Sequence, residues 1–328
     1  MLFRVQIAAL LAVTLAACAV DQSKAPQHQA QAVGSNVSKA CVLIDTDFDI
    51  DDMMAIPLVI TNKNVAAIIT TEGYTFAPQG ASALSRFIAE PSAEPGIPII
   101  IGANFPGKRD ISKWPWLLPM RTAMQQSNRL LSAPLTPKPQ VTPYELAVKN
   151  KLSDCKTVSV LVIGAFTSFV KYSPEIRDKI DLVVMQGRPR FVADASIKPK
   201  ISFNCGYDLE ACEKAFDQLK GLKAVWVDVP RKTDPLYTPT LAMVKGLDST
   251  GLSGTLKQAL IGNQITWNLG VMPKGENSLL WDQLAAQYLI HPELYKMVPG
   301  GFMEPVASAL EMQLLWTEST NKKIPIKP

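Results

Sequence analysis

Apolar runs alternate with stretches of helical spacing through most of the chain. Six runs rich in Val, Ile and Leu are the expected strands, at residues 42–44, 65–71, 97–101, 158–163, 182–186 and 224–229. Helical spacing is found at residues 52–61, 80–89, 144–152, 166–172 and 208–219. The strand runs are continuously apolar, which is typical of strands buried on both faces. This alternation predicts a single α/β domain with a mostly parallel central sheet flanked by helices, a Rossmann-like core.

One long segment, residues 105–140, breaks the alternation. It contains Trp114-Pro115-Trp116, several further prolines and scattered basic residues. Open parallel sheets bind ligands outside the carboxyl ends of their strands. We therefore expect this insertion either to cover such a site as a lid or to run over the sheet edge as a surface loop.

Composition narrows the functional classes. Apolar residues make up 47% of the 328 residues and charged residues 19%, so a sizeable core is expected rather than global disorder. The net charge of +4 is mild and dispersed, which argues against a nucleic-acid partner. The two histidines, His28 and His291, are too few for most histidine-based mechanisms or a Cys/His zinc site.

The amino-terminal region has the features of an export signal. Residues 1–4 form a short start that carries the basic Arg4, and residues 5–13 form a mostly apolar run too short for a permanent membrane span. Leu15-Ala16-Ala17-Cys18 resembles the lipobox of bacterial lipoproteins, which implies that Cys18 is lipidated after cleavage. Ala19 resembles the residue that directs lipoproteins to the outer membrane. The alternative is an ordinary cleaved signal with an incidental cysteine, which gives a soluble periplasmic protein.

These features divide the chain into three expected parts. Residues 1–18 are the signal peptide, residues 19–39 are a Gln-, Ala- and Ser-rich tether, and residues 40–328 form the folded domain. Membrane contact is expected through the lipid anchor only.

Four further cysteines are expected in a compartment that permits disulfides. Cys41 and Cys155 each precede an apolar run, so neighbouring parallel strands would place them at the same edge and let them pair. Cys205 and Cys212 are close enough in sequence to pair as well. Four free buried thiols fit the sequence equally well, because cysteine buries readily.

The chemical signal of the chain is an aspartate cluster at a strand-to-helix junction. Five aspartates fall within eight residues: Asp45, Asp47, Asp49, Asp51 and Asp52. One or two would cap the helix, but five would repel one another strongly. A hard cation such as Ca²⁺ or Mg²⁺ removes this repulsion. A solvated acidic loop is the alternative.

Two enzyme families resemble this cluster to different degrees. Asp45-x-Asp47 resembles haloacid-dehalogenase phosphatases poorly, because those chains have Thr or Val where Asp49 stands. The full pattern Asp-x-Asp-x-x-x-Asp-Asp resembles the inosine–uridine nucleoside hydrolase family, which usually has Pro-Gly where Phe48-Asp49 stand. Further segments resemble that family in consistent order, at residues 68–73, 164–168, 173–176, 183–187, 203–210, 281–285 and 291–294.

The resemblance implies a nucleoside hydrolase-like fold and a set of roles. Ca²⁺ would be held by Asp47, Asp52, the carbonyl of Thr167 and Asp282. A water on the cation would be the nucleophile that cleaves the N-glycosidic bond, with Asp47 as its general base. Asp45 would support the ligands, and Asp49 falls outside the pattern. The remaining positions would bind substrate, namely Asp51, Asn204, Met185 and Trp281.

Several positions depart from the family. Trp281 replaces a histidine that some members use to protonate the leaving base, and it either stacks on a base or simply packs in a helix. Ser196, Ser202 and Tyr74 replace polar residues near the sugar. Four nearby basic residues would either welcome an anionic sugar substituent or form a solvated loop: Arg188, Arg190, Lys198 and Lys200.

The sequence thus predicts an exported Ca²⁺-dependent hydrolase of a nucleoside or related N-riboside. The rival prediction is a catalytically weak relative that keeps the metal and binds a ribosyl ligand. A phosphatase is a distant third. The resemblance also implies a homo-oligomer, although a lipid-anchored relative need not form one.

Overall fold

The computed structural model describes residues 39–89, 96–107, 112, 114–115, 117, 121, 140–187, 202–228, 234–268 and 282–322. Contacts group residues Ser38–Pro328 into one compact unit. The predictions for Cys18, His28, Ser196, Trp281 and the basic residues 188–200 lie outside the described residues.

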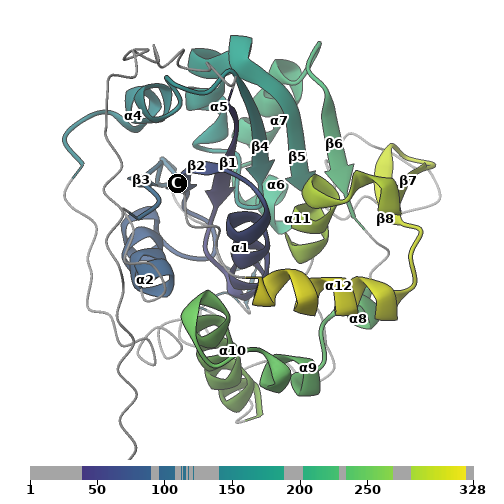
Figure 1. Ribbon diagram of the computed structural model, residues 1–328. Coiled ribbons are helices and arrows are strands. Elements are labelled where there is room, and N and C mark those ends of the chain that lie inside the picture. Colours follow the sequence, from purple (N-terminus) through teal and green to yellow (C-terminus); the bar gives the residue numbers. More distant parts are fainter. Residues whose placement is uncertain are drawn as a thin grey trace, which may run out of the picture. The chain divides into compact units, whose positions relative to one another are not determined.

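A mostly parallel sheet forms the centre of the unit (Figure 1). In the described part of the chain it has eight strands in the order β3-β2-β1-β4-β5-β6-β8-β7, and β7, which pairs with β8, is the one antiparallel member. The strands are β1 Ala40–Thr46, β2 Val65–Thr70, β3 Ile99–Ile101, β4 Thr157–Val162, β5 Ile180–Gln186, β6 Ala224–Val227, β7 Tyr295–Val298 and β8 Phe302–Pro305. The predicted single α/β domain with a flanked parallel sheet is confirmed.

Helices cover both faces of the sheet (Figure 1). Their bounds are α1 Ile50–Asn62, α2 Ala77–Ala89, α4 Tyr144–Lys151, α5 Phe169–Tyr172, α6 Phe203–Tyr207, α7 Leu209–Gln218, α8 Asp234–Tyr237, α9 Leu241–Gly246, α10 Gly251–Asn268, α11 Asp282–Ile290 and α12 Ala309–Asn321, with short 3-10 turns η2 at Ser173–Lys179 and η3 at Pro292–Leu294. No helix among these described residues is both long and apolar enough to cross a membrane.

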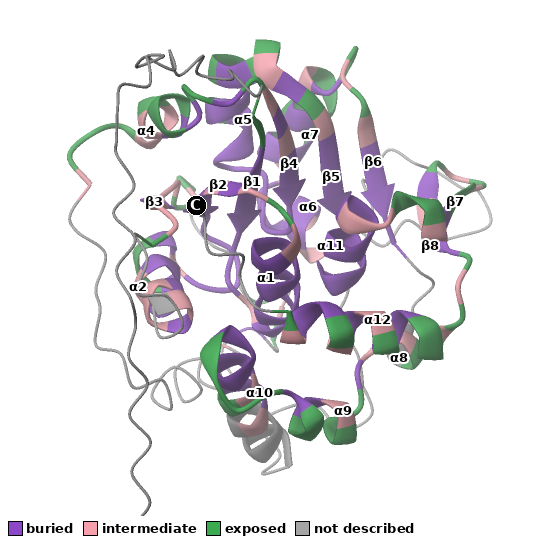
Figure 2. Ribbon diagram, viewed as in Figure 1, coloured by how far each residue is buried: buried purple, intermediate pink, exposed green. Residues whose placement is uncertain are grey.

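Two apolar clusters lie on opposite faces of the sheet. Val42 and Ile44 of β1 join the cluster that contains α1, α11 and α12, whereas Cys41 and Leu43 join the cluster that contains α4, α5 and α7. Alternate side chains of one strand therefore enter different cores, which is why the strand runs are continuously apolar. Figure 2 shows the central strands buried along most of their length.

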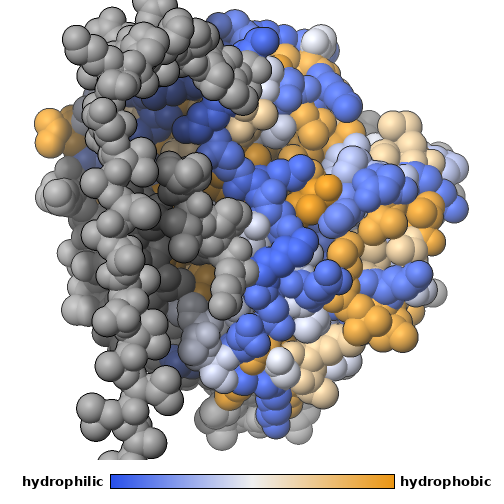
Figure 3. Space-filling model, in the orientation of Figure 1, coloured by the Kyte–Doolittle hydropathy of each residue, from blue (hydrophilic) through white to orange (hydrophobic). Residues whose placement is uncertain are grey.

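The last helix has an inner and an outer apolar face. Met312 and Trp316 of α12 are buried, and the Trp316 indole donates to the Met54 carbonyl at 3.0 Å. Leu310 and Leu314 are exposed, beside the exposed Leu236 of α8. Apolar side chains accordingly gather over α12 and α8 in Figure 3.

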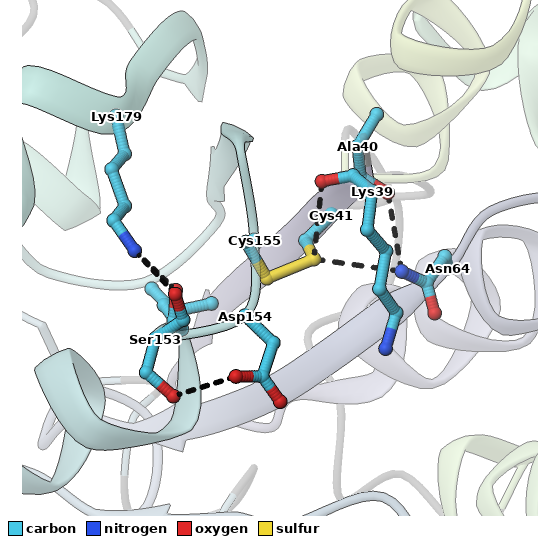
Figure 4. Close-up of a disulfide and its surroundings, with 9 residues drawn as sticks. Lys39, Ala40, Cys41, Asn64, Ser153, Asp154, Cys155 and Lys179 are labelled. Atoms are coloured by element: carbon cyan, nitrogen blue, oxygen red, sulfur yellow. Dashed lines mark hydrogen bonds between the residues drawn. A yellow bond between two sulfur atoms is a disulfide. The ribbon is translucent and has the colours of Figure 1, made fainter. Parts of the chain in front are cut away.

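Both predicted cysteine pairs are disulfides. Cys41 at the start of β1 is bonded to Cys155 just before β4, with a Cα–Cα distance of 5.8 Å (Figure 4). The two strands are neighbours, as the sequence-based hypothesis required. Cys205 in α6 is bonded to Cys212 in α7. The alternative of four free thiols is thereby excluded.

The strand order places a topological switch point between β1 and β4. From β1 the chain proceeds outward to β2 and β3, and it then returns to β4 on the other side of β1. A crevice forms at the carboxyl ends of two strands where the order reverses in this way. The aspartate cluster follows β1 at this position.

Candidate active site

The loop after β1 holds an unusual backbone conformation at Phe48. Its φ is 52°, in the left-handed region that bulky side chains seldom adopt. The Phe48 ring is fully buried and packs edge-on against Phe87 at 5.7 Å, and the Phe48 N–H donates to the Thr46 hydroxyl at 3.0 Å. Buried packing thus holds a strained turn at the centre of the acidic loop.

Asp49, which the family pattern leaves without a role, is the N-cap of α1. Its side chain accepts from the Ile50 N–H, and its own N–H donates to Asp52 Oδ2 at 2.8 Å, which forms a capping box. Asp52 Oδ1 accepts from the Thr46 hydroxyl. The cap begins the helix at a fixed point and so orients Asp51 and Asp52 in its first turn.

Asp47 is enclosed by main chain. Its Oδ2 accepts from the Tyr74 N–H at 2.7 Å, and its carbonyl accepts from the Thr75 N–H at 3.2 Å and the Thr75 hydroxyl at 2.8 Å. Gly73 and Gly164 lie against it, and a Cβ on Gly164 would come within 2.7 Å of the Asp47 nitrogen. The segment after β2 and the segment after β4, which are far apart in sequence, therefore both restrict the position of Asp47.

Three carboxylates come together as a group that could hold a metal ion. One oxygen each from Asp51, Asp52 and Asp282 lies within 4.8 Å of the others, and all three residues are buried. Asp282 Oδ1 has no hydrogen-bond partner among the described residues. An orphaned buried carboxylate oxygen beside two more carboxylates fits a hard divalent cation.

Thr167, the predicted carbonyl ligand, lies in the segment between β4 and α5. Its hydroxyl donates to Asp208 Oδ2 at 2.7 Å, and Asp208 also caps α7. The N–H groups of the following turn bond to the carbonyls of Phe166 and Ser168, so no N–H in the described residues donates to the Thr167 carbonyl. This carbonyl is available as an oxygen ligand, although its role stays a prediction.

Asp45, near the carboxyl end of β1, is fully buried. Its Oδ1 accepts from the Thr71 hydroxyl at 2.5 Å, and its Oδ2 has no partner among the described residues. Burial raises the pKa of Asp45 to about 7, although the hydrogen bond from Thr71 opposes the shift. The predicted supporting role of Asp45 stays a prediction.

The other carboxylates have raised pKa values for the same main reason. Burial, followed by repulsion from Asp51, raises the pKa of Asp52 to about 7. Burial together with neighbouring carboxylates raises the pKa values of Asp47, Asp49 and Asp282 well above the usual range. Without a cation, the raised pKa values therefore favour the protonated form of the aspartates that would bind the metal in this family.

Two of the predicted substrate-binding residues, Asn204 and Met185, lie in different surroundings. Asn204 is buried, and its amide nitrogen donates to the Ile163 carbonyl at 2.8 Å and to Gln186 Oε1 at 2.9 Å. A sugar hydroxyl would therefore meet Asn204 Oδ1. Met185 is fully buried in an apolar cluster, whereas Gln186, which the sequence did not single out, holds Asn204. Ser202 caps α6 by accepting from the Cys205 N–H at 3.3 Å.

Comparison with known proteins identifies the family. A profile of the family described as "Inosine-uridine preferring nucleoside hydrolase" matches residues 42–321. The chain belongs to this family. Its members act on N-glycosyl bonds and depend on a metal, so the chain is a hydrolase of N-glycosyl bonds. The phosphatase hypothesis has no support from the family match.

Solved structures share the nucleoside hydrolase fold. A purine-preferring ribonucleoside hydrolase from Gardnerella vaginalis has a TM-score of 0.64 at 15% identity, over 86% of this chain and 98% of that one. An inosine–uridine preferring nucleoside hydrolase from Bacillus anthracis has 0.60 at 14%, over 87% and 100%. The type III effector XopQ complexed with adenosine diphosphate ribose has 0.60 at 14%, over 86% and 92%. No curated protein sequence matches the chain.

Three residues that hold parts of this candidate site were missing from the sequence-based prediction. Gln186 holds Asn204, Asp208 holds Thr167, and Arg121 holds the backbone beside Asp47. Asp208 stands at a family position and could have been found as a capping residue. Gln186 and Arg121 carry no local signal, because their partners are distant in sequence.

Proposed function

We propose that the protein is a Ca²⁺-dependent N-ribohydrolase that releases the base from a nucleoside or a related N-riboside. The observation that carries the proposal is the buried group of Asp51, Asp52 and Asp282 with its orphaned oxygen, at the switch point of a nucleoside hydrolase fold. Carboxylate and carbonyl oxygens are the ligands that Ca²⁺ prefers. Asp52 and Asp282 of this group would hold the ion, and Asp51 would face the sugar. Asp47 and the Thr167 carbonyl lie outside the group of three and are further proposed ligands from the family resemblance.

Asp47 is the proposed general base. When bound, Ca²⁺ supplies the positive charge that lowers the pKa of the attacking water. The carboxylate of Asp47 takes a proton from this water while the water oxygen forms its bond to the anomeric carbon. The electrons of the N-glycosidic bond leave with the base nitrogen, which then takes up a proton. The hydrogen bond from Tyr74 keeps one Asp47 oxygen fixed, so the other can face the water.

The remaining carboxylates support the sugar during cleavage. Breaking the N-glycosidic bond develops positive charge on the ribose, as in other glycoside hydrolyses. Asp51 and Asn204 would hold the ribose hydroxyls, and the surrounding carboxylates would stabilise that charge. Proton delivery to the leaving base cannot follow the histidine route of some relatives, because Trp281 stands at that position.

The substrate range is best found with a panel of ribosides. Purine, pyrimidine and pyridine ribonucleosides cover the base classes. Adenosine diphosphate ribose is included because it is the ligand named for the XopQ structure. We expect base release from at least one nucleoside with Ca²⁺ and none after chelation. Ligand-induced thermal shifts without base release from any member would instead support a ribosyl-binding protein.

Substitution of Asp47 tests the proposed mechanism. We expect Asp47→Ala to lower kcat by about 10²–10⁴, the usual contribution of a general base. The matched control is Asp217→Ala, because Asp217 is exposed and pairs with Lys220 at the surface. Unchanged turnover in Asp47→Ala would refute the mechanism.

We also propose export through the amino-terminal signal and anchoring through Cys18. The two disulfides support an oxidising compartment. Labelling with a radioactive fatty acid, compared between the wild type and Cys18→Ala, tests the anchor. A soluble periplasmic wild-type protein without label would support the ordinary signal peptide instead.

A further inference from the structure

Arg121, from the insertion between β3 and α4, binds the loop at residues 73–76, which packs against Asp47. Its Nε donates to the Tyr74 carbonyl at 2.6 Å, and its Nη2 donates to the Gly73 carbonyl at 2.8 Å. The guanidinium also lies over the Phe76 ring, 4.5 Å from the ring centroid. The Arg121 guanidinium thus binds one short loop through two hydrogen bonds and a cation–π contact.

The contact to Gly73 reaches Asp47 through one peptide unit. The carbonyl of Gly73 and the N–H of Tyr74 belong to the same peptide group. Arg121 donates to that carbonyl, and the N–H on the other side donates to Asp47 Oδ2 at 2.7 Å. A positive donor on a carbonyl polarises the peptide and strengthens its N–H as a donor, because consecutive hydrogen bonds reinforce one another. The same bonds fix the orientation of the peptide.

Arg121 is itself held in place by a buried polar contact network. Its Nη2 lies 3.4 Å from the Tyr207 hydroxyl, which donates to Glu72 Oε1 at 2.6 Å. Glu72 Oε2 accepts from the Phe105 N–H at 2.9 Å. Trp114 packs against Tyr207 with ring centroids 5.6 Å apart. The described residues of the insertion are therefore joined both to the Asp47 loop and to α6, which carries Asn204.

We infer that Arg121 is a positioning residue of the active site: through the Gly73–Tyr74 peptide it sets the orientation and hydrogen bonding of the Asp47 carboxylate. The inference rests on the proposed function, because it concerns Asp47 as Ca²⁺ ligand and general base. It gives the insertion a role in catalysis that does not require contact with substrate. Arg121 has no described contact with the carboxylates themselves.

The test compares two substitutions of Arg121 with a matched control in the full-length protein. Arg121→Gln removes the charge and the two-pronged donor, whereas Arg121→Lys keeps the charge but reaches only one carbonyl. Arg177→Gln is the control, since Arg177 also donates to two backbone carbonyls, those of Gln218 and Lys220, but is exposed and remote from the site. Calorimetric titration with Ca²⁺ alone and steady-state kinetics on an accepted nucleoside are measured for each.

We expect Arg121→Gln to weaken Ca²⁺ binding about 10–100-fold, the range seen when a partner of a metal ligand is lost. We expect kcat to fall by a similar factor with a smaller change in KM, because the substitution disturbs the general base Asp47 and leaves the sugar contacts in place. Arg121→Lys should lie between this variant and the wild type, and Arg177→Gln should match the wild type.

Each outcome bears on the inference. Wild-type Ca²⁺ affinity and kcat in folded Arg121→Gln would overturn it and leave the proposed function standing. If Arg121→Gln does not fold, wild-type values in Arg121→Lys would overturn it in the same way. Absence of Ca²⁺ binding by the wild-type protein would overturn the proposed function and this inference together.

Discussion

Individual residues of the aspartate cluster differ in how far their sequence context fixes them. The sequence predicts Asp45, Asp47, Asp51 and Asp52 at the junction between the carboxyl end of β1 and the start of α1, and the structure has them there. The N-cap role of Asp49 could have been read from its position before the helix. The contact of Tyr74 with Asp47 could not, because it joins loops that follow different strands.

Gly164 provides a test of how closely Asp47 is held. We expect Gly164→Ala to lower the free energy of unfolding by about 1–3 kcal/mol, because its Cβ would press on the backbone at Thr46 and Asp47. The displaced Asp47 should also bind Ca²⁺ more weakly. Chemical denaturation and calorimetry measure the two effects.

Gly246→Ala is the control for that substitution. A Cβ at Gly246 would meet nothing within 4 Å, so we expect unchanged stability or a slight gain. Equal behaviour of the two alanine variants would contradict the close fit around Asp47.

At the scale of elements, the sequence predicted the strands with long apolar runs and missed most elements after residue 229, including the long helices α10 and α12. The six predicted strands correspond to β1–β6, although β6 ends at Val227 and the described Asp228, inside the predicted run, lies outside the strand. The hairpin of β7 and β8 was missed, since strands of four residues with Lys296 and Glu304 carry little periodicity. The five-residue α6 was missed for the same reason.

The start of α1 leads to a prediction about Asp49. We expect Asp49→Ala to cost about 1 kcal/mol of stability through loss of the N-cap. Asp49→Asn keeps a capping oxygen and removes one charge beside three other carboxylates, so in metal-free protein it should be at least as stable as the wild type. Urea denaturation in the presence of a chelator distinguishes the two. A larger loss in Asp49→Asn than in Asp49→Ala would contradict the cap.

The two disulfides should contribute unequally. Cys41–Cys155 closes a loop with a sequence separation of 114, whereas Cys205–Cys212 has a separation of 7. If restriction of the unfolded chain dominates, loss of the first bond should cost about 4–5 kcal/mol and loss of the second about 2–3 kcal/mol. Double Cys→Ser variants at each pair, compared by denaturation, check the order. The reverse order would point to a structural contribution of the shorter bond near Asn204.

For the whole molecule, fold class and the position of the site followed from the order of strands and helices. Alternation implied a parallel sheet, and the aspartates after the first strand implied a site at its carboxyl edge. The sequence could not show that β1 lies between β2 and β4, because strand order depends on packing between distant segments. It is this order that brings Gly164 against Asp47 of the aspartate cluster.

Stability of the metal-free protein should fall as the pH rises, and the stabilising effect of Ca²⁺ should grow over the same range. In metal-free protein Asp45 and Asp52 have pKa values of about 7 when folded, against the ordinary 3.8. The folded state therefore binds more protons, and the stability gained below pH 4 is lost as the pH rises through 7. Ca²⁺ competes with these protons, so its stabilising effect should be greatest above pH 7.

Thermal unfolding from about pH 5 to 8.5 measures this dependence. We expect Tm in chelator to fall as the pH rises, and the increase in Tm on adding Ca²⁺ to grow over the same range. A Ca²⁺-induced increase in Tm that is larger at pH 5 than at pH 8 would contradict the assignment of Asp52 as a ligand of the cation.

The bond between Cys41 and Cys155 also has a mechanical consequence. Ala40 begins β1, a central strand of the sheet, and Cys41 is the next residue. A pulling force applied at the amino end of the domain would act first on β1 and tend to peel it from its neighbours. The covalent bond passes that load to the segment leading into β4 after a single residue of the strand. The hydrogen bonds of β1, and the aspartates at its far end, are thereby shielded from tension.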